Sequence, residues 1–298
     1  MLREPLGEFP VGVCQFDTAE IGESCPRKVP LLFYYPSAPW TDEYPYKDPG
    51  YLAKAPESPD NGVHTFCGDK PALSDAKKTF PVVLFSHGLC GYSMENTTLC
   101  ADLASHGYVV ISIGHPFGSK IVSYTDGTVF SDPEPFRTLR RKVDKLEALW
   151  YEDTLAAFQM AEALGRDDDV WGGRLDLSSA GIVGDSFGGC CAIAAALKNG
   201  EIRYAVNLDG GLFVPFNYVY LQKPILVLCR SWNIKAYPGL SSHGCTQVEI
   251  VKYRGMKHYE FSDGVYLGPK GKKNRSWADQ NSRERSERIL QFLQKTKK

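Results

Sequence analysis

The stretch AGIVGDSFGGCCAIAAAL, residues 180–197, decides how this chain folds. It opens with a short apolar run, residues 180–183, which predicts a strand, and it closes with a segment of small apolar residues, 190–197, which predicts a buried helix. Between them lies GDSFG, a G-x-S-x-G sequence in the strand–turn–helix setting that lifts a serine clear of its backbone. We therefore expect Ser186 to be a nucleophile at the edge of an α/β sheet.

The rest of the chain alternates apolar runs with helical patterns. Strands are expected at residues 31–35, 80–85, 108–113, 204–208, 224–229 and 248–253, helices at 93–105, 136–164 and 279–296, and a hairpin at 121–130. Gly165 is the expected cap of the long central helix. Continuously apolar strands alternating with helices form a parallel sheet that is covered on both faces. The sequence thus predicts an α/β-hydrolase fold, with a mostly parallel central sheet and helices on both faces.

One domain over residues 1–298 is expected, because no linker or repeat interrupts this alternation. Residues 38–80 form a proline- and aromatic-rich insertion with no clear period. Loops of this length inside compact domains are usually functional or disordered, and the aromatic residues favour an ordered flap.

A serine nucleophile needs a general base, and the base needs an acid that orients it. In this fold class the chain order is Ser, then Asp or Glu, then His. His258 is the expected base because it hangs in a loop after the last strand, and His243 is the alternative. Asp209 is the expected acid, since it ends a strand at the sheet edge where the active sites of open α/β sheets lie.

Two other carboxylates compete for the role of the acid. Asp263 follows His258 by five residues on the same loop, and Asp185 stands beside the nucleophile. Neither is well placed to approach the far nitrogen of the imidazole, which favours Asp209.

Two backbone N–H groups should form the oxyanion hole. One is the N–H of Phe187, the residue after the nucleophile. The other is expected in the loop SHGLCG, residues 86–91, where glycines allow close approach of the backbone and Leu89 is the candidate donor. An acyl pocket is expected just beyond the acid, walled by Leu212, Phe213 and Phe216 and therefore suited to short acyl chains.

The composition excludes several classes of protein. The chain has 34 Lys and Arg against 35 Asp and Glu, so it lacks the basic excess of a nucleic-acid-binding protein. No apolar run reaches the about 20 residues of a transmembrane helix, which leaves only peripheral contact with a lipid surface. Nine cysteines without C-x-x-C or zinc-ligand spacing predict no metal site, and no cofactor is expected.

The N-terminus lacks the apolar stretch of a signal peptide, so a cytoplasmic location is expected. The alternative is a secreted protein whose leader is missing from this sequence.

Several of these motifs resemble the platelet-activating factor acetylhydrolase family, which includes the lipoprotein-associated phospholipases. The motifs are PVVLFSHGL at 81–89, DLASHGY at 102–108, the serine turn, the Leu208-Asp209 strand end and the Arg254-Gly255-x-x-His258 loop. The resemblance implies an α/β-hydrolase fold and calcium-independent hydrolysis of short or oxidised acyl chains from phospholipids. It also implies an acid at Asp209 and an oxyanion donor at Leu89. The family usually has His where this chain has Asp185 before the nucleophile.

The residues and the resemblance together predict a serine esterase that cleaves short-acyl esters of small molecules or lipids, through an acyl-Ser186 intermediate. Platelet-activating-factor-like or oxidised phospholipids are the expected substrates. The alternatives are a general carboxylesterase or polyesterase with the same triad, and a catalytically silent binding module on this scaffold.

Overall fold

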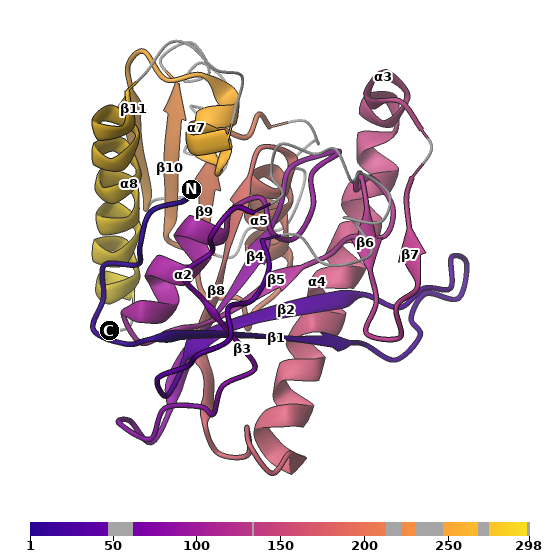
Figure 1. Ribbon diagram of the computed structural model, residues 1–298. Helices are drawn as coiled ribbons and strands as arrows, with labels where there is room; N and C mark the ends of the chain where they lie inside the picture. Colours follow the sequence, from indigo (N-terminus) through magenta and orange to yellow (C-terminus); the bar gives the residue numbers. More distant parts are fainter. Residues whose placement is uncertain (47–61, 133, 213–221, 231–246, 268–273, 297–298) are drawn as a thin grey trace.

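A nine-stranded sheet organises the part of the chain that this computed structural model describes, residues 1–46, 62–132, 134–212, 222–230, 247–267 and 274–296 (Figure 1). The strand order is β11-β10-β9-β8-β4-β5-β2-β1-β3, and the six strands from β11 to β5 run parallel. The strands are β1 Val11–Asp17, β2 Pro30–Pro36, β3 Gly68–Asp69, β4 Phe80–Ser86, β5 Val109–Ile113, β8 Leu175–Asp185, β9 Ala205–Leu208, β10 Ile225–Arg230 and β11 Val248–Tyr253. The predicted mostly parallel sheet is confirmed.

Helices cover both faces of the sheet, as predicted. The long α4 (Val143–Asp167) and α5 (Phe187–Lys198) pack on one face, and α2 (Thr97–Ser105) and α8 (Arg275–Thr296) pack on the other. Short elements complete the fold: the β6 (Val122–Ser123) and β7 (Val129–Phe130) hairpin, α3 (Phe136–Leu139), the 3-10 turns η1 (Arg140–Lys142) and η3 (His258–Phe261), and α7 (Gly264–Leu267).

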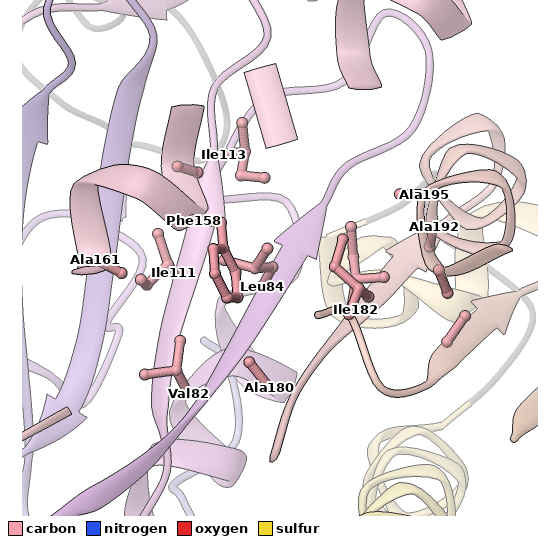
Figure 2. Close-up of a cluster of buried hydrophobic side chains, with 14 of the residues drawn as sticks. Val82, Leu84, Ile111, Ile113, Phe158, Ala161, Ala180, Ile182, Ala192 and Ala195 are labelled. Atoms are coloured by element: carbon pink, nitrogen blue, oxygen red, sulfur yellow. The ribbon is translucent and has the colours of Figure 1, made fainter. Parts of the chain in front are cut away.

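Two apolar cores result, because successive side chains of a strand point to opposite faces. Val82 and Leu84 of β4 join Phe158 of α4 in the core of the first face, shown in Figure 2. Val83 and Phe85, the alternating residues of the same strand, pack in the second core with α2 and α8. Continuous apolarity of the central strands thus reflects burial on both sides.

Some predicted boundaries were wrong. The central helix does not end at Gly165 but continues to Asp167, because Asp168 makes the stop: its carboxylate accepts the N–H groups of Val170 and Trp171. The same helical region is divided by η1, and α2 begins at Thr97 rather than residue 93. Strand β1 was not predicted; it pairs antiparallel with β2.

The segment 38–80 contributes to the sheet edge where it is described. β3 pairs with β1, and Tyr44 and Cys67 lie buried in the second core. The Tyr46 hydroxyl donates to Asp263 Oδ2 at 3.2 Å, which ties the segment to the loop that follows β11. Residues 47–61 lie outside the described residues, and a flap role for the segment stays a prediction.

Candidate active site

The serine turn has the strained geometry expected of an exposed nucleophile. Ser186 joins β8 to α5 with φ 54° and ψ −117°, a conformation that L-residues rarely adopt. Glycines make the turn possible: a Cβ on Gly184 would lie 2.2 Å from the carbonyl oxygen of Gly188, and a Cβ on Gly188 would lie 2.2 Å from that of Ser86. The strand, the turn and the start of α5 therefore pack closer than any larger residue allows.

Three predicted side chains meet at the carboxyl ends of the parallel strands. His258 Nε2 lies 2.7 Å from Ser186 Oγ, and its Nδ1 lies 2.7 Å from Asp209 Oδ2. Since a carboxylate only accepts, Nδ1 carries the hydrogen, and Nε2 is left as the acceptor facing the serine hydroxyl. The arrangement is that of a nucleophile, a general base and an orienting acid.

Asp209 is held from several sides. It follows β9 with φ 53°, and its side chain is fully buried. Asp209 Oδ1 accepts a hydrogen bond from the backbone N–H of Arg230 at 2.8 Å. Asp209 Oδ2 contacts both His258 and the Arg230 guanidinium, and the guanidinium nitrogen lies 2.5 Å from it. Arg230 was not predicted from the sequence, although its position at the end of β10, beside β9 in a parallel sheet, was a usable signal.

The histidine loop is fixed by η3. Glu260 Oε2 accepts the Lys257 N–H at 2.6 Å and so caps the turn that begins at His258. Asp263 N–H donates to the carbonyl of Glu95 at 2.8 Å, which anchors the loop to the segment before α2. His243, the alternative base, lies outside the described residues.

The two competing carboxylates make other contacts. Asp263 accepts the Thr98 N–H at 3.2 Å as well as the Tyr46 hydroxyl, and burial raises its pKa to about 7. Asp185 is buried beside Glu95, and burial, with the Glu95 and Asp209 charges, raises its pKa well above the usual range. Neither makes a hydrogen bond to His258 within the described part of the chain.

Leu89 and Phe187, the residues of the predicted oxyanion donors, line the same cavity as Ser186. Among the described residues, no hydrogen bond engages the N–H of Leu89 or Phe187. The carbonyl of Gly88, which shares a peptide group with the Leu89 N–H, is held by His87 Nδ1 at 2.8 Å and by the Gly91 N–H at 2.9 Å. Because the peptide group is planar, fixing this carbonyl also fixes the direction of the Leu89 N–H.

Two side chains hold Gly88, and one of them, Glu95, was not predicted from the sequence. His87 is buried, and burial lowers its pKa to about 3, so the neutral ring donates from Nδ1 to the Gly88 carbonyl. Glu95 Oε1 accepts the Gly88 N–H at 2.8 Å. Both polar groups of the glycine before Leu89 are therefore engaged. The H-G pair of residues 87–88 was visible in the sequence, but no local pattern pointed to Glu95.

A second Ser–His–Asp arrangement lies deeper in the molecule. His115 Nε2 lies 2.9 Å from Ser86 Oγ, and His115 Nδ1 lies 2.8 Å from Asp153 Oδ2. The Asp153 carboxylate also accepts a hydrogen bond from Arg27. All three residues are essentially inaccessible, and the His115 ring stacks on Trp150 at 3.9 Å. A serine without access to solvent cannot meet an ester, so this group supports the loop after β4.

A cavity of about 260 Å³ opens at Ser186 and His258. Its wall includes Leu89, Phe187, Asp209, Gly211 and Arg230, and also Phe136, Arg140 and Val143 of the α3–α4 region. The predicted acyl wall is only partly described: Leu212 packs against the core of the first face, and Phe213 and Phe216 lie outside the described residues.

Within the described ranges, no group of three or more His, Cys, Asp or Glu side chains could hold a metal ion, and no helix is long and apolar enough to cross a membrane. None of the eight cysteines described there is joined in a disulfide.

The sheet order, the strained serine turn and the layered helices define an α/β hydrolase. Solved structures of that class superpose on the chain: a ferulic acid esterase from Streptomyces cinnamoneus with a TM-score of 0.73 (18% identity, 99% of this chain and 92% of the other), and a dienelactone hydrolase from Anabaena variabilis with a TM-score of 0.53 (15% identity, 95% and 99%).

Within this class, the chain is similar over part of its length to the platelet-activating factor acetylhydrolases. Residues 63–148 match the family model "Platelet-activating factor acetylhydrolase, isoform II". Curated platelet-activating factor acetylhydrolases from Bos taurus and Gallus gallus are 25% and 23% identical, over 64% and 66% of this chain. The matches span 50% and 57% of those proteins' length. The resemblance noted in the sequence is confirmed.

Proposed function

We propose that this chain is a serine esterase that hydrolyses short-acyl carboxylic esters through an acyl-Ser186 intermediate. The observation that carries the proposal is the continuous chain of contacts from Ser186 Oγ through His258 to Asp209, with 2.7 Å at each step, at the mouth of a cavity.

The proposed reaction has two halves. In the first, Ser186 Oγ attacks the ester carbonyl carbon while His258 Nε2 takes the hydroxyl proton and then gives it to the leaving alcohol. In the second, water attacks the acyl-enzyme, His258 takes a proton from the water, and the acid leaves as Oγ is reprotonated. Asp209 holds the imidazole in the required tautomer and stabilises the imidazolium.

The oxyanion formed in each half would be bound by the N–H groups of Leu89 and Phe187. Removal of one such donor has cost about 2.7–4 kcal/mol of transition-state stabilisation in a studied enzyme. The N-terminus of α5 adds its dipole at the same place.

Platelet-activating-factor-like or oxidised phospholipids are the proposed substrate class. The names of the curated relatives support this class, and the limited apolar cavity suits a short acyl chain. Each methylene that fits contributes about 0.8 kcal/mol on burial, but one that meets the wall contributes nothing.

Turnover of a short-acyl phospholipid, a long-acyl phospholipid and para-nitrophenyl butyrate tests the proposal, with Ser186→Ala as the matched control and with and without EDTA. We expect wild-type hydrolysis of the short-acyl phospholipid to persist in EDTA and to vanish in Ser186→Ala. Turnover of the nitrophenyl ester alone would favour a general carboxylesterase. No turnover of any ester would favour a silent binding module.

A further inference from the structure

One part of the cavity wall holds apolar and cationic side chains that are not part of the triad. Phe136, Arg140 and Val143 come from α3, η1 and the start of α4, and they line the same cavity as Ser186 and His258. Phe136 is 52% exposed, which is unusual for a large apolar side chain in the described part of this molecule. The wall therefore joins an apolar surface to a cation.

The cation lies in a basic turn. Arg137, Arg140, Arg141 and Lys142 fall within six residues of a chain whose net charge is −1. Lys142 pairs with Glu134 at 2.5 Å. Within the described ranges, Arg140 makes no ion pair or side-chain hydrogen bond, so its five N–H donors have no described partner, and the residue is exposed where it lines the cavity.

The other charges of the cavity wall are already matched. Arg230 pairs with Asp209, and that carboxylate also holds His258. Asp209 is the one carboxylate among the described lining residues, so an incoming anion would meet little repulsion there. Among the described residues of the wall, Arg140 is thus the charge without a counter-charge.

We propose that Arg140 is an anion subsite of this esterase, where a phosphate or carboxylate carried by the ester substrate binds while Phe136 and Val143 contact its apolar part. The inference rests on the proposed function. Guanidinium groups match the geometry of both anions and can bind them through two parallel hydrogen bonds.

Two pairs of esters distinguish the sources of the anion. For a charge on the acyl side, para-nitrophenyl valerate is compared with the mono-para-nitrophenyl ester of glutaric acid, which ends in a carboxylate. For a charge on the alcohol side, dibutyrylglycerol is compared with dibutyrylphosphatidic acid. Wild-type protein, Arg140→Gln and Arg140→Glu are measured, and Arg141→Gln is the control because Arg141 is an exposed neighbour outside the described lining.

In at least one pair, we expect Arg140→Gln to raise KM for the anionic ester by about tenfold or more, with KM for the neutral ester and kcat for both changed less than about twofold. Arg140→Glu should raise KM for the anionic ester further, and Arg141→Gln should change this KM little. Added salt should raise KM of wild-type protein for the same anionic ester and should leave Arg140→Gln nearly unaffected. The pair that responds identifies the carboxylate or the phosphate. Equal changes for the charged and neutral members of both pairs would overturn the subsite.

Binding to Ser186→Ala protein separates the subsite from the proposed function. Calorimetry with the same esters needs no turnover. A preference for an anionic ester that disappears in the Ser186→Ala, Arg140→Gln double variant supports the subsite even if wild-type protein hydrolyses nothing. The absence of any such preference overturns it, whatever the activity.

Discussion

At the scale of single residues, Asp209 is the group on which the triad depends most. Replacing it by Asn keeps the size but offers the His258 Nδ1 an amide in place of a carboxylate, which favours the wrong imidazole tautomer. The equivalent change in a serine protease lowers turnover about 10⁴-fold, and we expect a loss of at least about 10²-fold here.

Steady-state turnover of Asp209→Asn, Asp263→Asn and Asp185→Asn, each checked for folding by circular dichroism, decides between the acids. Asp263 and Asp185 make no hydrogen bond to His258 in the described structure, so their variants should keep most of the activity. A near-normal Asp209→Asn beside an inactive Asp263→Asn would assign the acid elsewhere.

Glu95 has a positioning role at the same scale. It accepts the N–H of Gly88, whose carbonyl is held by His87. Glu95→Leu removes the acceptor of the Gly88 N–H, which lies in the peptide group just before the one that carries the Leu89 N–H. The loop then loses one of its anchors while His87 still holds the Gly88 carbonyl, so we expect kcat to fall about tenfold, less than the loss of a whole oxyanion donor, while KM changes little. Glu95→Gln keeps an acceptor and should recover most of the rate; equal losses in both variants would contradict the role.

Asp263 predicts a pH dependence of stability. Its pKa is raised to about 7 by burial, so between about pH 4 and 7 the folded state holds a proton that the unfolded state has released. The free energy of unfolding should therefore fall as pH rises through this window and level off above it. Urea denaturation at several pH values measures this free energy. Between about pH 4 and 7, the free energy of unfolding of Asp263→Asn should fall by about 1–3 kcal/mol less than that of wild-type protein. Parallel curves would show that Asp263 is ionised throughout.

At the scale of elements, the sequence predicted the sheet better than it predicted the helix ends. Runs such as residues 80–85 and 108–113 are apolar on both faces. A short segment that must be buried on both faces is most simply a central strand of a covered sheet. The end of α4 escaped prediction because Asp168, rather than Gly165, makes the stop through local hydrogen bonds. β1 escaped because its sequence, VGVCQFD, is only half-buried beyond its first three residues and so has a weaker apolar pattern than the central strands.

The packing of α5 against β4 yields an element-scale prediction. A Cβ on Gly188 would meet the Ser86 carbonyl at 2.2 Å, whereas a Cβ on Gly200 meets nothing within 4 Å. Gly188→Ala should therefore displace the helix start, with loss of activity and a thermal midpoint lowered by several degrees, since a strained core substitution typically costs about 1–3 kcal/mol. Gly200→Ala should behave as wild type. A fully active and stable Gly188→Ala would show that the turn can relax.

At the scale of the whole molecule, strand order explains why the site could be predicted and its surroundings could not. Ser186, Asp209 and His258 follow parallel strands, so each could be placed at one edge of the sheet from the sequence. Glu95 and Arg140 reach the site from segments that the sheet does not position. Their roles depend on how α2 and the α3–α4 region pack, which no local pattern encodes.

The central claim is that Ser186 forms a covalent bond with its substrate while His258 and Asp209 activate it. The most direct measurement is stoichiometric labelling with a fluorophosphonate, followed by mass spectrometry of the proteolytic peptides. We expect one label per chain, on Ser186, with labelling much slower in His258→Ala and absent in Ser186→Ala. A label on another residue, or an unreactive wild-type chain that still hydrolyses esters, would contradict it.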